Sequence, residues 1–179
     1  MKKRNRKPAR SPVSKTKPEE VLQTLRQRGL HLATAESLTG GGVGQALTSV
    51  PGSSEVYKGG IVSYTNEIKQ NLLHVSEKNL ERFGAVSAPV ALEMAKGARE
   101  ALNAEVGIST TGLAGPGGDD FGNPVGTVFI ACDWDGRAVC RECHFTGSRD
   151  WIRIATIDAA LKLALEVASG EAKGQQLLF

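Results

Sequence analysis

A serine followed by a run of glycines is the part of the sequence with the clearest potential for chemistry. Ser37 follows an apolar segment, 30–35, and precedes glycines at 40–42, after which 43–50 has helical apolar spacing. The pattern predicts a strand, a tight turn and a helix N-terminus. The first amides of a helix lack acceptors and lie at the positive end of its dipole. Such a turn can hold a phosphate or a developing oxyanion, and glycines let a ligand approach the backbone.

A purely structural role is also compatible with this turn. Ser37 could serve only as a helix N-cap, and the glycines could only permit close packing. Two standard motifs are absent, because Ser37 is not in Gly-x-Ser-x-Gly and no Gly-Lys-Ser/Thr follows the glycines.

A serine is a weak nucleophile and needs a base. His31 lies six residues before Ser37 on the same predicted strand, which would separate the two by about 20 Å in an extended chain. His74 and His144 are distant in sequence, and each fits a surface or satisfied core histidine as well as a base.

Lysine can replace histidine when burial keeps it partly neutral. Lys69 lies early in a predicted helix that follows the strand bearing Tyr64. This junction could place both groups over the Ser37 turn. The alternative is an ordinary exposed lysine on a helix.

The remaining chain alternates helical and strand patterns. Pro18 and Gly29 bound an amphipathic helix, 18–28, and Asp135-Gly136 joins the last two strands as a hairpin. We expect an α/β protein, a three-layer α/β/α sandwich with a mixed sheet and helices on both faces. Further strands are predicted at 56–65, 106–111, 127–131 and 138–145, and further helices after Asn66, after Ser76, from Ser87 to about Leu102 and over 149–168, with Ile152, Ile154, Ile157, Leu161 and Leu165 buried.

The basic residues of the 179-residue chain are concentrated at its N-terminus. Residues 1–17 hold eight of the 22 lysines and arginines and no acid, so the rest of the chain is mildly acidic although the net charge is +3. We predict a disordered basic tail, 1–17, a single domain, 18–169, and a loose C-terminal tail, 170–179. The basic tail could contact nucleic acid, although no aromatic residues are interleaved for base stacking.

The apolar segments and the cysteines of the sequence indicate the cellular compartment and whether a metal is bound. No apolar run is long enough to span a bilayer and the basic start lacks the apolar segment of a signal peptide, so we expect a cytoplasmic protein. Cys140 and Cys143 have redox or zinc spacing, with Cys132 and His144 nearby, but on a strand residues three apart point to opposite faces. We therefore expect reduced thiols and no metal.

Five segments together resemble the CinA C-terminal domain family, the family of bacterial nicotinamide mononucleotide deamidases. The resemblance runs from about Val21 to Leu165. The segments, in order, are Thr-Ala-Glu-Ser-Leu-Thr-Gly-Gly at 34–41, Gly-Gly-Ile-Val-Ser-Tyr-Thr-Asn-Glu-Ile-Lys at 59–69, Gly-Ala-Val-Ser at 84–87, Gly-Leu-Ala-Gly-Pro at 112–116 and Pro-Val-Gly-Thr-Val at 124–128.

The resemblance implies hydrolysis of an amide. Family enzymes convert nicotinamide mononucleotide to nicotinate mononucleotide and ammonia without a metal or cofactor, and tend to form homodimers. Carried over, Ser37 is the nucleophile, Lys69 its general base and Tyr64 a partner in proton relay. The chain resembles the stand-alone deamidase rather than members with a preceding molybdopterin-binding-like domain.

Substrate contacts are expected from three places. Amides of the Ser37 turn are expected to hold the oxyanion, the 112–118 loop to close over the nucleotide, and Arg149 to bind the 5′-phosphate, with Arg153 one turn further on. A rigid turn and a surface arginine are the alternatives. The expected substrate-binding residues are Thr39, Gly40, Gly41, Thr111, Gly112, Gly115 and Arg149.

The sequence is also compatible with two other functions. One is a non-catalytic protein linked to DNA uptake or repair that uses the basic tail, and the other is a serine amidase acting on a different amide.

Overall fold

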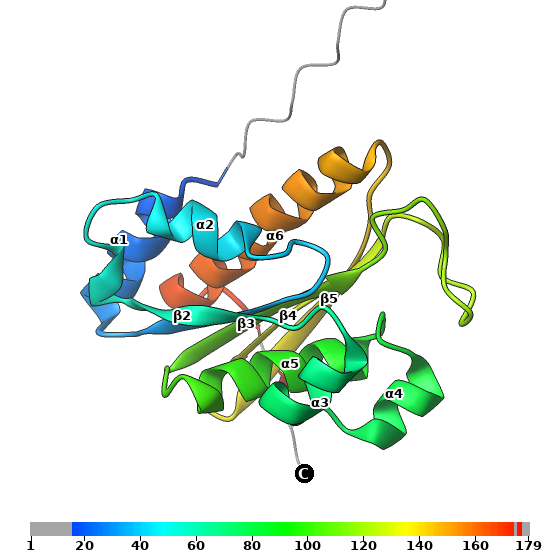
Figure 1. Ribbon diagram of the computed structural model, residues 1–179. Helices are drawn as coiled ribbons and strands as arrows, with labels where there is room; N and C mark the ends of the chain where they lie inside the picture. Colours follow the sequence, from blue (N-terminus) through cyan, green and yellow to red (C-terminus); the bar gives the residue numbers. More distant parts are fainter. Residues whose placement is uncertain (1–15, 174, 177–179) are drawn as a thin grey trace, which may run out of the picture.

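The protein is built on one mixed β-sheet with strand order β2-β1-β3-β4-β5-β6 (Figure 1). The computed structural model describes residues 16–173 and 175–176. β1 pairs in parallel with β2 and with β3, whereas β3/β4, β4/β5 and β5/β6 are antiparallel. The strands are β1 (Leu32–Glu36), β2 (Tyr57–Val62), β3 (Val106–Gly112), β4 (Thr127–Trp134), β5 (Arg137–His144) and β6 (Gln175–Gln176).

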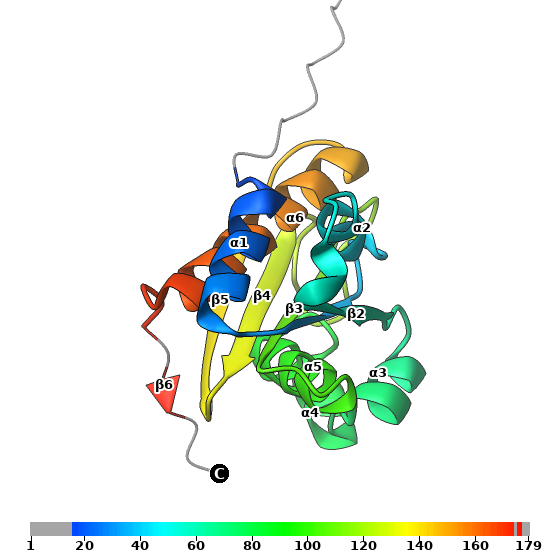
Figure 2. The ribbon, with the colours of Figure 1, turned by 90° about the vertical axis from the view of Figure 1, so that its left-hand side faces the viewer.

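Helices cover both faces of this sheet (Figures 1 and 2). One face carries α1 (Pro18–Arg28), α2 (Gly42–Thr48) and α6 (Arg149–Ser169), and a short 3-10 turn, Ser53–Glu55, follows α2. The opposite face carries α3 (Asn66–Leu73), α4 (Glu77–Phe83) and α5 (Ala88–Ala101). The predicted three-layer α/β/α sandwich with a mixed sheet is confirmed.

Local sequence signals fix most helix ends. Pro18 opens α1, and Gly29 closes it in the left-handed conformation with φ 65°. Ser76 caps α4 by accepting a hydrogen bond from the amide of Asn79, and Ser148 caps α6 in the same way.

The hairpin predicted at Asp135-Gly136 is present between β4 and β5. Both residues have positive φ, 48° and 68°, which a two-residue turn between right-twisted strands requires. This turn sets the register that pairs Trp134 with Arg137.

The apolar core fills the space between the sheet and each helix layer. Two of the residues predicted to be buried on α6 are buried, Ile152 and Leu161. The other three, Ile154, Ile157 and Leu165, are only half-buried. The sheet, α1 and α2 cover one stripe of this long helix, and residues beside that stripe keep part of their surface in solvent.

The predicted strand 56–65 ends early, at Val62, and α3 is capped by Thr65 rather than Asn66. Ser63, the next residue, accepts from Lys69 through its carbonyl, while its amide still donates to the carbonyl of Glu36. Thr65 then has the extended backbone of an N-cap, and its hydroxyl accepts from the amide of Ile68.

Both predicted tails are partly anchored. The amide of Thr16 donates to the carboxylate of Asp158 on α6. Gln175–Gln176 pairs with Ala138 and Arg137 as β6, so the prediction of a loose end is wrong for these two residues. Residues 1–15 of the predicted basic tail, 1–17, lie outside the described residues, so the disorder and the nucleic-acid contact expected there stay predictions.

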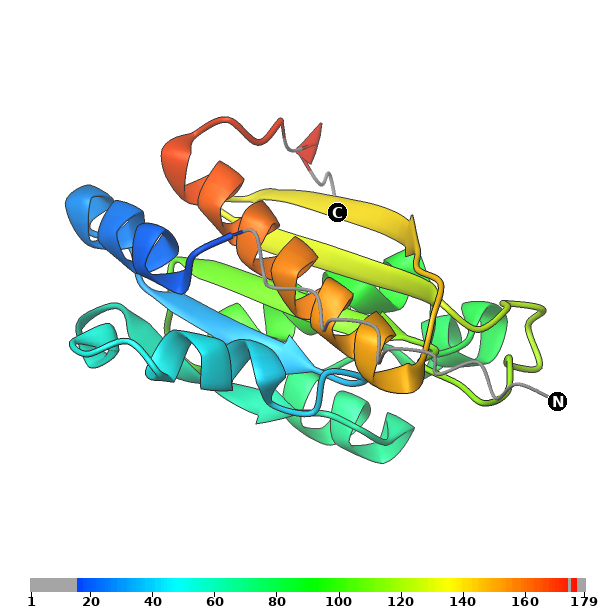
Figure 3. The same ribbon diagram turned by 90° about the horizontal axis from the view of Figure 1, so that it is seen from above.

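The parallel strands β1, β2 and β3 end at the same edge of the sheet. Glu36 pairs with Val62 on one side and Thr110 on the other, so the segments that follow these strands meet there. Figure 3 shows the first turn of α6 and the loop 113–126 at this end of the molecule. Ligand sites of open α/β sheets characteristically lie at this edge.

Candidate active site

Ser37 and Lys69 meet at the carboxyl edge of the sheet. Ser37 is the first residue after β1, and Lys69 lies in the first half of α3. The Lys69 Nζ donates to Ser37 Oγ at 3.1 Å and to the carbonyl oxygen of Ser63 at 2.6 Å. Ser37 is 9% exposed and Lys69 is 1% exposed. The structure therefore brings together the two residues expected to act as nucleophile and base.

The Lys69 ammonium is buried without a carboxylate partner among residues 16–173 and 175–176. Burial lowers the pKa of Lys69 from 10.5 to about 8, because desolvation disfavours the charged form. Roughly a tenth of the lysine is then neutral at pH 7. A partly neutral amine within hydrogen-bond distance of a hydroxyl has the chemistry of a general base.

Glu36 is a residue of this site that the sequence analysis did not single out. It is 2% exposed, and its carboxylate accepts from the amide of Val43 at 3.0 Å and of Gly44 at 2.8 Å. The N-terminus of α2, expected to receive a substrate anion, is thus occupied by the protein's own carboxylate. The sequence feature that could have revealed this role is an acidic residue shortly before the start of a predicted helix, where a negative charge is stabilised by the helix dipole.

The Ser37 turn, defined as residues 37–41, keeps some of its amides free of internal bonds. The amide of Ser37 donates to Thr110 and that of Gly40 donates to the carbonyl of Ser37. Within the described residues, the amides of Leu38, Thr39 and Gly41 have no acceptor. Of the turn's amides, these three are therefore the ones available to a bound ligand.

Two expected substrate contacts have side chains with other partners. Thr39 is fully buried, and its hydroxyl is 2.8 Å from that of Thr110. The Thr111 hydroxyl donates to the carbonyl of Ala85 at 2.7 Å. Neither residue lines the cavity, because both side chains tie β3 to neighbouring segments instead.

Gly40 and Gly41 shape the turn through their backbone. Their φ angles are 60° and 93°, a conformation that glycine adopts without strain. They do not line the cavity at Ser37.

An open cavity of about 420 Å³ lies beside Ser37. It brings together the serine, the tyrosine, the arginine and much of the glycine-rich loop expected from the sequence. The residues that line it are Ser37, Leu38, Tyr64, Gly112, Leu113, Ala114, Gly115, Pro116, Gly117, Gly118 and Arg149.

Arg149 and Tyr64 contact each other at this cavity. The Arg149 guanidinium donates to the carbonyl of Gly115 at 2.6 Å and to the Tyr64 hydroxyl at 3.3 Å. Tyr64 is 61% exposed, and its hydroxyl makes no hydrogen bond to Ser37 or Lys69. The expected proton relay through Tyr64 is not seen in this geometry.

Arg153 is engaged differently from Arg149. It donates from Nε to the carbonyl of Leu38 and from Nη2 to that of Thr39, both at 3.0 Å. Its guanidinium therefore faces the backbone of the Ser37 turn.

The loop after β3 is braced internally. The Asp119 carboxylate accepts from the amides of Phe121 and Asn123 and from the Asn123 side chain. Asn123 also donates to the carbonyl of Val86 at 3.1 Å. Hydrogen bonds within the loop thus give it a defined conformation next to the cavity.

The three histidines lie away from the Ser37 cavity. His31 is 2.7 Å from a carboxylate oxygen of Glu105, His74 closes α3 in the left-handed conformation, and His144 pairs with Glu142. None of the three lines the Ser37 cavity.

The cysteines have the properties of protonated thiols. Burial raises the pKa of Cys132 strongly and that of Cys140 to about 12, and it also raises that of Cys143. In the described part of the chain, no three His, Cys, Asp or Glu side chains are grouped as metal ligands.

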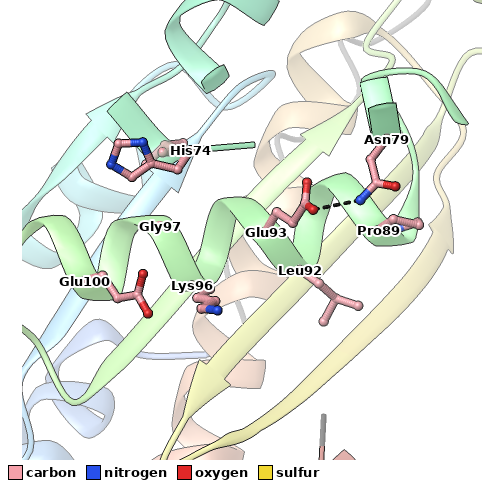
Figure 4. Close-up of a pocket in the computed structure, with 9 residues that line it drawn as sticks. His74, Asn79, Pro89, Leu92, Glu93, Lys96, Gly97 and Glu100 are labelled. Carbon is pink, nitrogen blue, oxygen red and sulfur yellow. Dashed lines mark hydrogen bonds between the residues drawn. The ribbon is translucent and has the colours of Figure 1, made fainter. Parts of the chain in front are cut away.

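A second cavity, of about 370 Å³, lies along the outer side of α5 (Figure 4). His74, Lys96 and Glu100 are among its lining residues, and Glu93 accepts a hydrogen bond from Asn79 at 2.7 Å. It shares no lining residue with the Ser37 cavity.

The fold and site define a class: an α/β protein with a buried serine–lysine pair at the carboxyl edge of a mixed sheet. The chain belongs to the CinA C-terminal domain family, whose model matches residues 14–168. The resemblance drawn from the sequence is therefore confirmed. None of the helices in the described ranges has the length and apolar content needed to cross a membrane.

Relatives and solved structures support this membership. A CinA-like protein of Synechococcus sp. (strain RCC307) is 52% identical over 145 residues, covering 80% of this chain and 35% of that protein. A putative competence-damage inducible protein of Clostridium botulinum (strain ATCC 19397 / Type A) is 43% identical over 143 residues with the same coverage. The chain thus spans about a third of the length of these curated relatives.

Solved structures match over nearly their whole length. A competence-damaged protein (CinA) superfamily protein from Escherichia coli has a TM-score of 0.83 at 35% identity, covering 93% of this chain and 99% of that one. The competence/damage inducible protein CihA from Agrobacterium tumefaciens has a TM-score of 0.79 at 37% identity, covering 88% and 99%.

The buried Glu36 carboxylate generates a prediction about stability. Glu36→Gln should lower the free energy of unfolding by about 1.5–3 kcal/mol, because glutamine keeps one acceptor oxygen and its –NH2 group leaves the amide of either Val43 or Gly44 without an acceptor. Urea unfolding measures the loss. Glu55→Gln, which removes an exposed ion pair with Arg26, should change stability by less than about 1 kcal/mol. A Glu36→Gln protein as stable as wild type would contradict the stabilising role given to the Glu36 carboxylate at the start of α2.

Proposed function

We propose that the chain is a nicotinamide-nucleotide amidohydrolase that converts nicotinamide mononucleotide to nicotinate mononucleotide and ammonia, in pyridine nucleotide salvage. The observation that carries the proposal is the 3.1 Å hydrogen bond from a buried Lys69, whose pKa is lowered to about 8, to Ser37 Oγ beside an open cavity. The family resemblance supplies the substrate.

Acylation begins with neutral Lys69. Its Nζ accepts the Ser37 hydroxyl proton as Oγ attacks the carboxamide carbon, forming a C–O bond and an oxyanion. The protonated lysine then gives this proton to the departing nitrogen. The C–N bond breaks, ammonia leaves, and the nicotinoyl group is esterified to Ser37.

Deacylation repeats the same steps with water. Lys69 takes a proton from a water that attacks the ester carbon, and Ser37 Oγ leaves with that proton. Nicotinate mononucleotide is released and the serine is regenerated. One lysine serves as base and then as acid in each half-reaction, a serine–lysine variant of the catalytic triad principle.

The oxyanion needs donors aimed at its position. Leu38 lines the cavity, and its amide has no acceptor within the described residues, so we assign it as a donor. The amide after a nucleophilic serine has this role in other serine hydrolases. The amide of Thr39 is a second candidate.

Arg149 is assigned to the substrate phosphate. It is the one cationic side chain that lines the Ser37 cavity, among the described residues. A phosphate would replace its present acceptors, the Gly115 carbonyl and the Tyr64 hydroxyl, with stronger charge-assisted bonds. Tyr64 then acts at the rim with Arg149 rather than in proton transfer.

The first prediction from this mechanism concerns ammonia release. Wild-type protein should release ammonia from nicotinamide mononucleotide, unaffected by EDTA. Ser37→Ala should abolish release, and Lys69→Ala should reduce it about 10²–10⁴-fold, the usual contribution of a positioned base.

The controls for this assay are Ser49→Ala and Lys78→Ala, which change exposed residues outside the site. Both should retain wild-type turnover. Full activity of Lys69→Ala would remove the lysine from the mechanism. No release by folded wild-type protein would reject the substrate.

The lowered pKa of Lys69 predicts a pH profile. The active base is the neutral form, so kcat/KM should rise with pH through a midpoint near 8 and then level off. A profile of kcat/KM from pH 6 to 9.5 measures this. Activity that falls as the pH passes 8 would mean that the protonated lysine is the required form.

Arg149→Ala tests the phosphate assignment. Loss of a charge-assisted contact should raise KM for nicotinamide mononucleotide about 10- to 100-fold. Nicotinamide riboside, which lacks the phosphate, provides the control, and its weaker turnover should not change. An unchanged KM for the mononucleotide would defeat the assignment.

A further inference from the structure

We infer that Arg153 is a positioning residue that fixes the amide donors of the Ser37 turn. This inference rests on the proposed function, because it concerns the stabilisation of an oxyanion formed at Ser37. Arg153 lies on α6, one turn after Arg149, and is half-buried. Arg149 lines the cavity. Arg153 instead donates to the carbonyls of Leu38 and Thr39, the two residues that follow Ser37 in the chain.

The first bond of Arg153 orients the amide of Thr39. Arg153 Nε donates to the carbonyl oxygen of Leu38 at 3.0 Å. The carbonyl of Leu38 and the N–H of Thr39 belong to one planar trans peptide, so they point in opposite directions. Holding the oxygen therefore fixes the direction of the Thr39 N–H.

The second bond orients the amide of Leu38 through one intermediate. Arg153 Nη2 donates to the carbonyl of Thr39 at 3.0 Å, which fixes the peptide whose other end is the Gly40 N–H. Gly40 in turn donates to the carbonyl of Ser37 at 3.1 Å. That carbonyl shares its peptide plane with the Leu38 N–H, the amide assigned to the oxyanion.

The guanidinium shape matters for this arrangement. Nε and Nη2 form one edge of a planar fork, which can donate to two neighbouring oxygens at once. A lysine ammonium also has several donors, but it lies at the end of a flexible stem and lacks the fixed planar spacing of the guanidinium N–H groups. Gly40 is favoured at this point of the turn by its φ of 60°.

Fixed donors matter because electrostatic stabilisation of an oxyanion depends on groups that need not reorient during reaction. Ser37 and Lys69 contact each other without Arg153. Loss of Arg153 should therefore reduce the stabilisation of the transition state. Substrate binding and the pKa of Lys69 should stay unchanged.

The test measures labelling of Ser37 by a fluorophosphonate. Ser37 Oγ attacks phosphorus, a P–O bond forms, fluoride leaves, and the serine proton passes to Lys69. Arg153→Gln should slow labelling about 10²-fold, the usual effect of losing an oxyanion donor. Arg153→Lys, which preserves the charge, should fall between wild type and Arg153→Gln.

Two further readouts separate positioning from a general structural role. With nicotinamide mononucleotide, Arg153→Gln should lower kcat with KM within about threefold of wild type. The midpoint near pH 8 of the labelling rate should not move, because Lys69 stays buried.

Arg28→Gln is the matched control. Arg28 also donates to two successive carbonyls, those of Ala168 and Ser169, at the other end of α6. Its loss should not change labelling. Thermal unfolding and circular dichroism of each variant establish that it is folded.

The outcomes are distinct. Wild-type labelling rates in folded Arg153→Gln, or an equal slowing by Arg28→Gln, would overturn the inference. Ser37-dependent labelling without ammonia release would reject the substrate but leave the Arg153 comparison readable. Absence of Ser37 labelling in wild-type protein would overturn both the serine mechanism and the inference.

Discussion

The arrangement of the site depends on a lysine ammonium that is buried in the protein interior with no carboxylate partner among the residues that the structure describes. Within the described part of the chain, the Lys69 ammonium donates to two oxygens that carry no formal charge, the carbonyl of Ser63 and the hydroxyl of Ser37. Desolvation therefore disfavours the cation, and the pKa falls toward the range in which an amine can accept a proton at neutral pH. A carboxylate partner would stabilise the charge and remove the basicity on which the proposed chemistry depends.

The sheet supplies the contacts that make this burial possible. β1 and β2 run in parallel, so Ser37 and Ser63 emerge next to each other, and the carbonyl of Glu36 accepts from the amide of Ser63. The chain then turns through Thr65 into α3, which returns Lys69 toward both strands. Ser63 lies just beyond the end of β2, where its carbonyl is available to accept from Lys69.

Groups of opposite charge hold the Ser37 turn and the helix α2 that follows it. Glu36 accepts from the first amides of α2, and Arg153 donates to the carbonyls of Leu38 and Thr39. Each ionised group satisfies backbone groups that the tight turn leaves without internal partners. The α2 helix end therefore serves the turn itself, and the substrate phosphate is assigned instead to Arg149 on α6.

The sequence by itself determined the fold class, the hairpin at Asp135-Gly136 and most helix ends, because these depend on local periodicity, capping and turn chemistry. It also pointed to Ser37, Lys69 and Arg149 through motif and spacing. Tertiary structure alone decided the burial of Lys69, the occupation of the α2 amides by Glu36 and the separate partners of Arg149 and Arg153. It also turned the Thr39 and Thr111 side chains away from the cavity. These outcomes depend on which segments meet across the sheet edge, and residue patterns along one segment carry no information about that meeting.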